Sequence, residues 1–124
     1  MGGEIMKTEN VVVDKSKAFA VRVVRLYQFL CDEKKEYVLS KQLLRSGTSI
    51  GANVKEAVRG QSKVDFIHKM NISLKEASET EYWLELLYET EYITEPQFES
   101  MITDCRELLK ILTSIINTSR KEGR

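Results

Sequence analysis

The chain has 124 residues, of which 42% are hydrophobic and 31% are charged, and this composition suits one globular domain rather than a disordered chain. No apolar run approaches the roughly 20 residues that a helix needs to cross a bilayer, and no secretory leader pattern is present. We therefore expect a soluble, cytoplasmic protein with no membrane contact. Cys31 and Cys105 lie within apolar helical patterns, so we expect buried thiols rather than a disulfide.

The charge is balanced overall but is distributed unevenly along the chain. Residues 39–70 carry six basic residues (Lys or Arg) and two acidic ones (Asp or Glu). Residues 71–104 carry one basic and nine acidic residues, and residues 105–124 carry five basic and two acidic residues. Such a separation favours head-to-tail self-association, an anionic partner, or both. Ordinary solvated helix faces would explain it as well.

Helical periodicity begins after a short N-terminal segment. Residues 1–13 show no period, so we expect a loose segment. The first helix is expected over residues 14–36, with Asp14 as its N-cap and an apolar stripe at every third or fourth position from Phe19 to Leu30.

The second helix, expected over residues 39–59 and closed by Gly60, contains the unusual stretch SGTSIGANVKEA. A glycine inside a helix costs about 1 kcal/mol relative to alanine. We therefore expect Gly47 to admit close approach of a large residue such as Trp83 or Tyr88. A polar stripe lies beside the apolar one, and buried polar groups need partners. The polar stripe consists of Ser46, Ser49, Asn53 and Glu56. Its expected partners on the third helix are Ser73, Lys75, Glu76 and Thr80. Two interpretations stay open: a network that fixes helix register, or a seam between subunits or with a ligand.

Two further helices complete the chain. Ser62 and Asp65 resemble a capping box that opens a third helix over residues 62–92, and Thr94 and Gln97 form one that opens a fourth helix over residues 95–118. The bundle then covers residues 14–119, and residues 120–124 form a frayed tail. Because the connections are short, the prediction is an all-α fold: an antiparallel, up-down-up-down four-helix bundle.

The run LLRSGTSIGANVKEAVRGQSKVDFIHKMNISLKEASETEYWLELL resembles a bacterial family of four-helix bundles. This family includes the ribosomal RNA intervening-sequence proteins and the diversity-generating retroelement accessory (Avd-like) proteins. The resemblance covers about residues 12–118. Its most specific part is the pattern formed by Arg45, Ser46, Ser49, Ile50, Asn53 and Glu56, followed by Phe66 and by Ser73-Leu74-x-Glu76. Many members have glycine where this chain has Ala57, a change that should leave the fold intact.

The resemblance implies a homo-oligomeric ring, commonly a pentamer. For retroelement members it implies a nucleic-acid-binding partner of a reverse transcriptase, and for intervening-sequence members it implies no clear biochemical activity. The motif residues look like packing and seam residues rather than catalytic ones.

Three functional hypotheses follow. The first is a non-enzymatic protein that binds RNA or DNA through phosphate contacts without reading sequence, because no aromatic platform lies among the basic residues. Its candidate residues are Arg22, Arg25, Lys41, Arg45, Lys55, Arg59 and Lys63. The second is a protein–protein scaffold or accessory subunit, for example of a reverse transcriptase, in which the acidic third helix meets a neighbour's basic second helix.

The third hypothesis is an enzyme. His68 is the only histidine, and its spacing from Asp65 resembles half of a di-iron bundle site. A complete site needs a second such motif, and none is present. We therefore expect no enzyme activity, no metal site and no cofactor.

Overall fold

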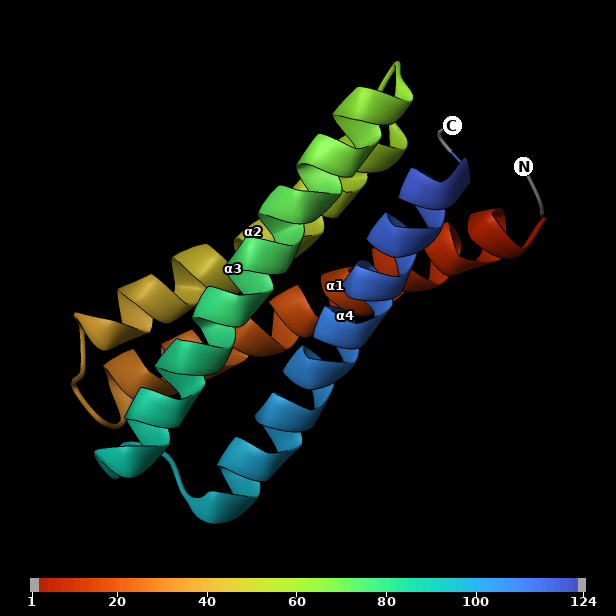
Figure 1. Cartoon of the computed structure of the whole chain (residues 1–124). Helices are drawn as coiled ribbons and strands as arrows, with labels where there is room; N and C mark the ends of the chain where they lie inside the picture. Colours follow the sequence, from red (N-terminus) through yellow and green to blue (C-terminus); the bar gives the residue numbers. More distant parts are fainter. Residues whose placement is uncertain (1–2, 123–124) are drawn as a thin grey trace.

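In a computed structural model that describes residues 3–122, with side chains from residue 7 onward, four helices form the predicted all-α bundle (Figure 1). The helices are α1 (Gly3–Asp32), α2 (Leu39–Val58), α3 (Lys63–Glu89) and α4 (Glu95–Glu122). Within the described residues, the backbones of α1 and α3 each lie close to those of both α2 and α4, whereas the backbones of the diagonal pairs α1–α3 and α2–α4 do not approach one another. Consecutive helices therefore lie side by side, and the α2–α3 turn lies at the end where α1 starts and α4 finishes (Figure 1).

The prediction of a loose segment over residues 1–13 is wrong from Gly3 onward, and Asp14 lies inside α1 rather than at its cap. Residues 1 and 2 lie outside the described residues. Val12 is fully buried and Ser16 is 1% exposed, so the core-facing spacing of four and three residues continues back from Phe19. Three consecutive valines conceal this period in the sequence, because only the middle one points fully into the core.

The first helix also ends earlier than predicted, at Asp32 rather than residue 36. Lys35 has a positive φ of 55°, and the backbone N–H of Glu36 donates to the carbonyl of Leu30 at 2.9 Å. The left-handed residue reverses the chain, and the hydrogen bond that reaches back six residues gives the Leu30 carbonyl, one of the last of the helix, a partner. The chain then turns directly into α2.

Glu36 caps the start of α2 with its side chain. Its carboxylate, on a residue only 9% exposed, accepts hydrogen bonds from the backbone N–H groups of Val38 at 3.2 Å, Leu39 at 3.0 Å and Ser40 at 2.7 Å. Burial by itself raises the pKa of Glu36, but the hydrogen bonds outweigh it and leave the pKa below its ordinary value. The first turn of α2 therefore depends on an ionised carboxylate.

Both predicted capping boxes bring their residues together. The hydroxyl of Ser62 accepts from the backbone N–H of Asp65 at 3.1 Å. At the start of α4, the backbone N–H of Thr94 donates to the side chain of Gln97 at 2.8 Å, and the reverse contact measures 3.4 Å. Local sequence therefore sets both starts.

Helix α4 continues to Glu122, beyond the predicted end at residue 118. The predicted fraying is therefore wrong for residues 120–122, and residues 123–124 lie outside the described residues. Ser119 is 4% exposed, and its carbonyl accepts a hydrogen bond from Lys63 at 3.4 Å. Packing against the start of α3 holds the last turns of α4 in helical form.

A single hydrophobic core runs between the four helices. Its largest fully buried side chains come from every helix and include Phe19, Leu30, Leu43, Ile50, Met70, Leu84, Leu108 and Leu112. At the α3–α4 turn, Tyr88 and Phe98 stack with their ring centroids 4.6 Å apart. None of the described helices combines the length and the low polarity needed to cross a bilayer.

Candidate nucleic-acid interface

The outer face of α2 carries one pair of cations near its start and another near its end, where Arg59 is the C-cap residue. Lys41, Arg45, Lys55 and Arg59 are all exposed. Their spacing along the helix puts them all on one side of α2. The buried residues Leu43, Ile50 and Val54 lie on the opposite side. None of the four side chains forms a hydrogen bond or ion pair with another described residue. Four cationic groups therefore face solvent over about 27 Å, at 1.5 Å per residue.

Helix α1 adds a cation that the sequence analysis missed. Lys17 and Lys55 line the same shallow groove between α1 and α2, together with small residues such as Gly51 and Ala52. Nothing in the spacing of one helix identifies Lys17, because it joins the basic face only when two helices pack. The basic face is defined below as Lys17, Lys41, Arg45, Lys55 and Arg59.

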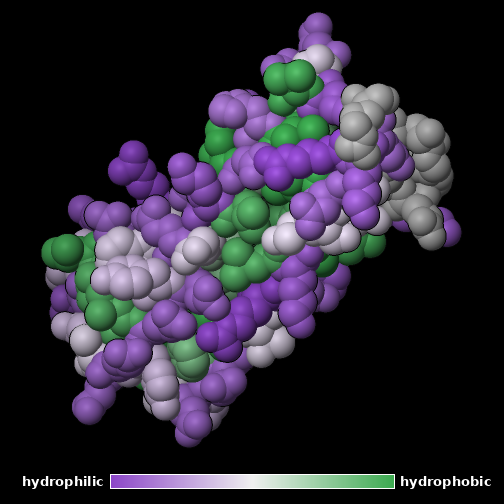
Figure 2. Space-filling model, viewed as in Figure 1, coloured by the Kyte–Doolittle hydropathy of each residue, from purple (hydrophilic) through white to green (hydrophobic). Residues whose placement is uncertain are grey.

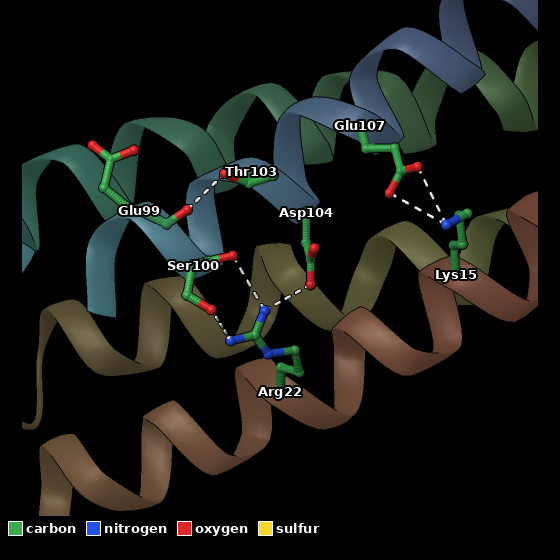
Figure 3. A network of polar contacts seen from close by, with 7 residues as sticks. All are labelled: Lys15, Arg22, Glu99, Ser100, Thr103, Asp104 and Glu107. Atoms are coloured by element: carbon green, nitrogen blue, oxygen red, sulfur yellow. Dashed lines mark hydrogen bonds and ion pairs between the residues drawn. The ribbon is translucent and has the colours of Figure 1, made fainter. Parts of the chain in front are cut away.

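Three other predicted binding residues lie against α4 rather than beside the cations of α2. The prediction that they extend the same basic surface is therefore wrong. Arg22 points to α4, where its guanidinium donates to Asp104 at 2.6 Å and to the hydroxyl of Ser100 at 2.6 Å (Figure 3). Arg25 lines a groove between α1 and α4. Lys63 donates to the carbonyl of Ser119 near the end of α4, as described above. Helix phase directs Arg22 and Arg25 toward α4, and the hydrogen bond to Ser119 draws the side chain of Lys63 toward the same helix.

Few acidic residues lie at the edges of the basic face, and one of them, Asp14, lines the same groove as Lys17 and Lys55. Glu56 lies beside it, but its carboxylate is paired with Lys69 of α3 at 2.8 Å. Glu76 of α3 has a raised pKa, chiefly through burial and then through the nearby carboxylate of Glu79, whereas Arg45 acts in the opposite direction. The electrostatic potential of the outer face of α2 is therefore dominated by its cations.

Inside the bundle, some polar side chains of α2 form hydrogen bonds to α3, and others bond to the backbone of their own helix. Ser46 is 1% exposed, and its hydroxyl is hydrogen-bonded to that of Thr80 at 2.9 Å. The hydroxyl of Ser73, fully buried, donates to the carbonyl of Ile50 at 2.8 Å. These bonds join α2 to α3 within one chain, so both hydroxyls serve helix register. Lys75, proposed as another partner, is exposed.

The remaining two stripe residues bond to their own helix. The hydroxyl of Ser49 donates to the carbonyl of Arg45 at 2.7 Å, and the amide of Asn53 donates to the carbonyl of Ser49 at 2.8 Å. The expected partners on α3 are therefore wrong for Ser49 and Asn53. Both side chains are partly exposed, so a seam role for them stays a prediction.

Removing one partner of the buried hydroxyl pair should be costly. Thr80→Val keeps the shape of the side chain but leaves Ser46 with only a 3.4 Å contact to the carbonyl of Leu43. An unsatisfied buried hydroxyl costs about 1–3 kcal/mol, and we expect the free energy of unfolding in urea to fall by that amount. Ser46→Ala in the same chain should restore part of the loss. Equal stability of Thr80→Val and the parent would contradict this account.

The two glycines of α2 allow α1 to approach closely. A Cβ atom at Gly47 would lie 2.7 Å from both methyl groups of Val23, and one at Gly51 would lie 3.2 Å from the carbonyl oxygen of Ser16. The predicted close approach is therefore present, but the neighbour at Gly47 is Val23 of α1 rather than an aromatic residue of α3. Gly60, by contrast, needs no positive φ.

The other candidate chemical groups are dispersed. His68 is exposed on α3. Cys105 is buried, its thiol donates to the carbonyl of Ala77 at 3.3 Å, and burial raises its pKa to about 12, so it is held as a neutral thiol. Among the described side chains, no group of three or more His, Cys, Asp or Glu is placed to hold a metal ion.

The architecture defines the class of protein: a four-helix bundle whose α2 packs on α1 through glycines, bonds to α3 through buried hydroxyls, and presents cations to solvent. The chain belongs to the 23S rRNA-intervening sequence protein family, whose model matches residues 8–114. It is similar to a crystal structure of a protein of unknown function from the S23 ribosomal protein family of Bacteroides thetaiotaomicron, with 64% identity and a TM-score of 0.88. The match covers 89% of this chain and 98% of that chain. Comparison with curated proteins finds no significant match.

Proposed function

We propose that this protein is a non-enzymatic, ring-forming helical bundle of the cytoplasm that binds RNA or DNA through the basic face of each subunit. The observation that carries the proposal is that the four cations of α2 face solvent and form no ion pair within the described chain. Cations already paired inside a protein have less to gain from a phosphate, whereas unpaired ones release counterions from the nucleic acid when they bind.

The chemistry of the face favours phosphate contacts over base reading. Lysine and arginine supply its charge, and the side chains between them include Thr48 and Ala52, with no aromatic ring on which a base could stack. Backbone contacts position nucleic acid but carry no sequence information. Repetition of the face in an oligomer would raise the affinity of one long strand for the whole assembly, because later contacts are intramolecular.

The proposal predicts a strong effect of reversing charge on α2. Arg45→Glu with Arg59→Glu replaces two cations with two anions at exposed positions, so the fold should be retained. We expect at least about a 100-fold loss of affinity for labelled single-stranded RNA, single-stranded DNA and an RNA–DNA hybrid, measured by fluorescence anisotropy at several salt concentrations. The salt slope should fall by about 0.7–0.9 for each phosphate that the variant no longer neutralises.

A matched control separates the face from total charge. Lys110→Glu with Arg120→Glu makes the same charge change at exposed positions on α4, which lies diagonally opposite α2. This variant should retain most of the binding. Equal losses in the two variants would mean that net charge, not the basic face, drives binding. No binding of the parent protein even at low salt would reject the proposal and favour the alternative, a protein scaffold or accessory subunit.

A further inference from the structure

Two diagonal helices expose apolar side chains where no part of the described bundle covers them. On α1, Val21 is 49% exposed and Val24 is 37% exposed. On α3, Tyr82 is 55% exposed and lies edge-on against Trp83, with their ring centroids 5.0 Å apart. Because α1 and α3 occupy opposite corners of the bundle, these two surfaces point in different directions. Figure 2 shows one face of the bundle, where hydrophobic groups emerge between mainly hydrophilic ones.

The two surfaces carry opposite charge. Residues 15–28 of α1 contain four Lys or Arg and no acidic residue, whereas residues 76–89 of α3 contain five Glu and no cation. Each stretch is 14 residues long, or about 21 Å of helix. Two helical stretches that both expose apolar side chains and carry opposite charge are complementary to one another.

Ion pairs within the chain use only part of this charge. Lys15 and Arg22 of α1 pair with acidic residues of α4 (Figure 3), and Arg106 of α4 pairs with Glu81 at 2.8 Å and Glu85 at 3.5 Å. Among the described residues, Arg25 on α1 and Glu79 on α3 form no ion pair, and Glu79 only accepts a hydrogen bond from the indole of Trp83. Unpaired charge of opposite sign is therefore left beside Val21 on one surface and beside Tyr82 on the other.

We propose that the Val21–Val24–Arg25 surface of α1 docks on the Glu79–Tyr82 surface of α3 in a second copy of this chain, head to tail. The inference rests on the self-association in the proposed function and assigns the surfaces that make it. Tyrosine and tryptophan are the residues that most often anchor protein interfaces. Since the surfaces differ, the contact is heterologous, and repetition closes a ring when the rotation between neighbours allows it. The arrangement leaves the four cations of the α2 face open, unlike a contact between α3 and a neighbour's α2, whereas Lys17 lies one turn before Val21 and borders the seam.

Two blocked variants test the assignment. Val21→Glu with Val24→Glu blocks the α1 surface, and Ser78→Glu with Tyr82→Glu blocks the α3 surface; all four positions are exposed. Each variant alone should be monomeric in sedimentation or light scattering, with unchanged helix content. An equimolar mixture should give a dimer, because each partner retains one intact surface and the two blocked surfaces repel. Tyr37→Glu with Val38→Glu, at exposed positions in the α1–α2 turn, should assemble like the parent.

The outcomes distinguish the seam from the proposed function. If the parent assembles and either blocked variant assembles equally well, the seam is assigned wrongly while self-association stands. Failure of the two variants to pair on mixing would also overturn the head-to-tail geometry. A monomeric parent would reject both self-association and this seam. The blocked monomers should still bind labelled RNA or DNA at low salt through α2, and loss of that binding would contradict the separation of the two surfaces.

Discussion

Replacing Gly47 with a larger residue is expected to destabilise the bundle more strongly with each added carbon atom. Alanine gains about 1 kcal/mol of helix propensity, but its Cβ would lie 2.7 Å from both methyl groups of Val23. Overpacking of this kind costs about 1–3 kcal/mol. We expect a net loss for Gly47→Ala and a loss above about 3 kcal/mol for Gly47→Leu, measured as the free energy of unfolding in urea.

A compensating change checks that the contact with Val23 is the cause. Val23→Ala removes the two methyl groups, so combining it with Gly47→Ala should recover stability and give a favourable coupling energy of about 1–3 kcal/mol. Ala52→Gly, at an exposed position of the same helix, measures helix propensity alone and should cost about 1 kcal/mol. Additive effects of Gly47→Ala and Val23→Ala would refute the proposed contact.

Loss of the Glu36 carboxylate is expected to weaken the bundle at neutral pH and to have little effect in acid. Its three backbone hydrogen bonds favour the ionised form, so the pKa of the carboxyl is lower in the folded chain than in the unfolded one. The resulting stabilisation is complete above the unfolded pKa of about 4.3 and disappears as the pH falls through the folded value. We expect Glu36→Gln to cost about 1–2 kcal/mol at pH 7.

The measurement is the difference in free energy of unfolding between the parent and Glu36→Gln from pH 7 to pH 3. The difference should shrink below about pH 5, where the unfolded carboxyl begins to bind protons. Glu33→Gln, at an exposed position just after the last residue of α1, is the matched control and should show no such trend. A difference that is constant across this range would show that shape, rather than charge, makes the cap.

Local patterns were sufficient to predict most of the fold. Ser62 with Asp65 and Thr94 with Gln97 mark the starts of α3 and α4 because a capping box needs only residues three apart. The period of α1 was missed before residue 14, since consecutive valines hide which one faces the core. Glu36 was assigned to the end of the first helix, but its side chain caps the second. Its backbone N–H bonds to the last turns of α1 while its carboxylate accepts from the first turn of α2, and the sequence does not show that one residue serves both helices.

The sequence by itself determined the number of helices, their antiparallel order and the basic stripe of α2, because each depends on residues within one helix or one turn. Packing decided the rest. It placed Val23 rather than Trp83 against Gly47, turned Arg22 toward Asp104, and brought Lys17 beside Lys55. Helical periodicity specifies which residues share a face, but the neighbour of that face depends on how the helices cross, which is a property of the whole bundle.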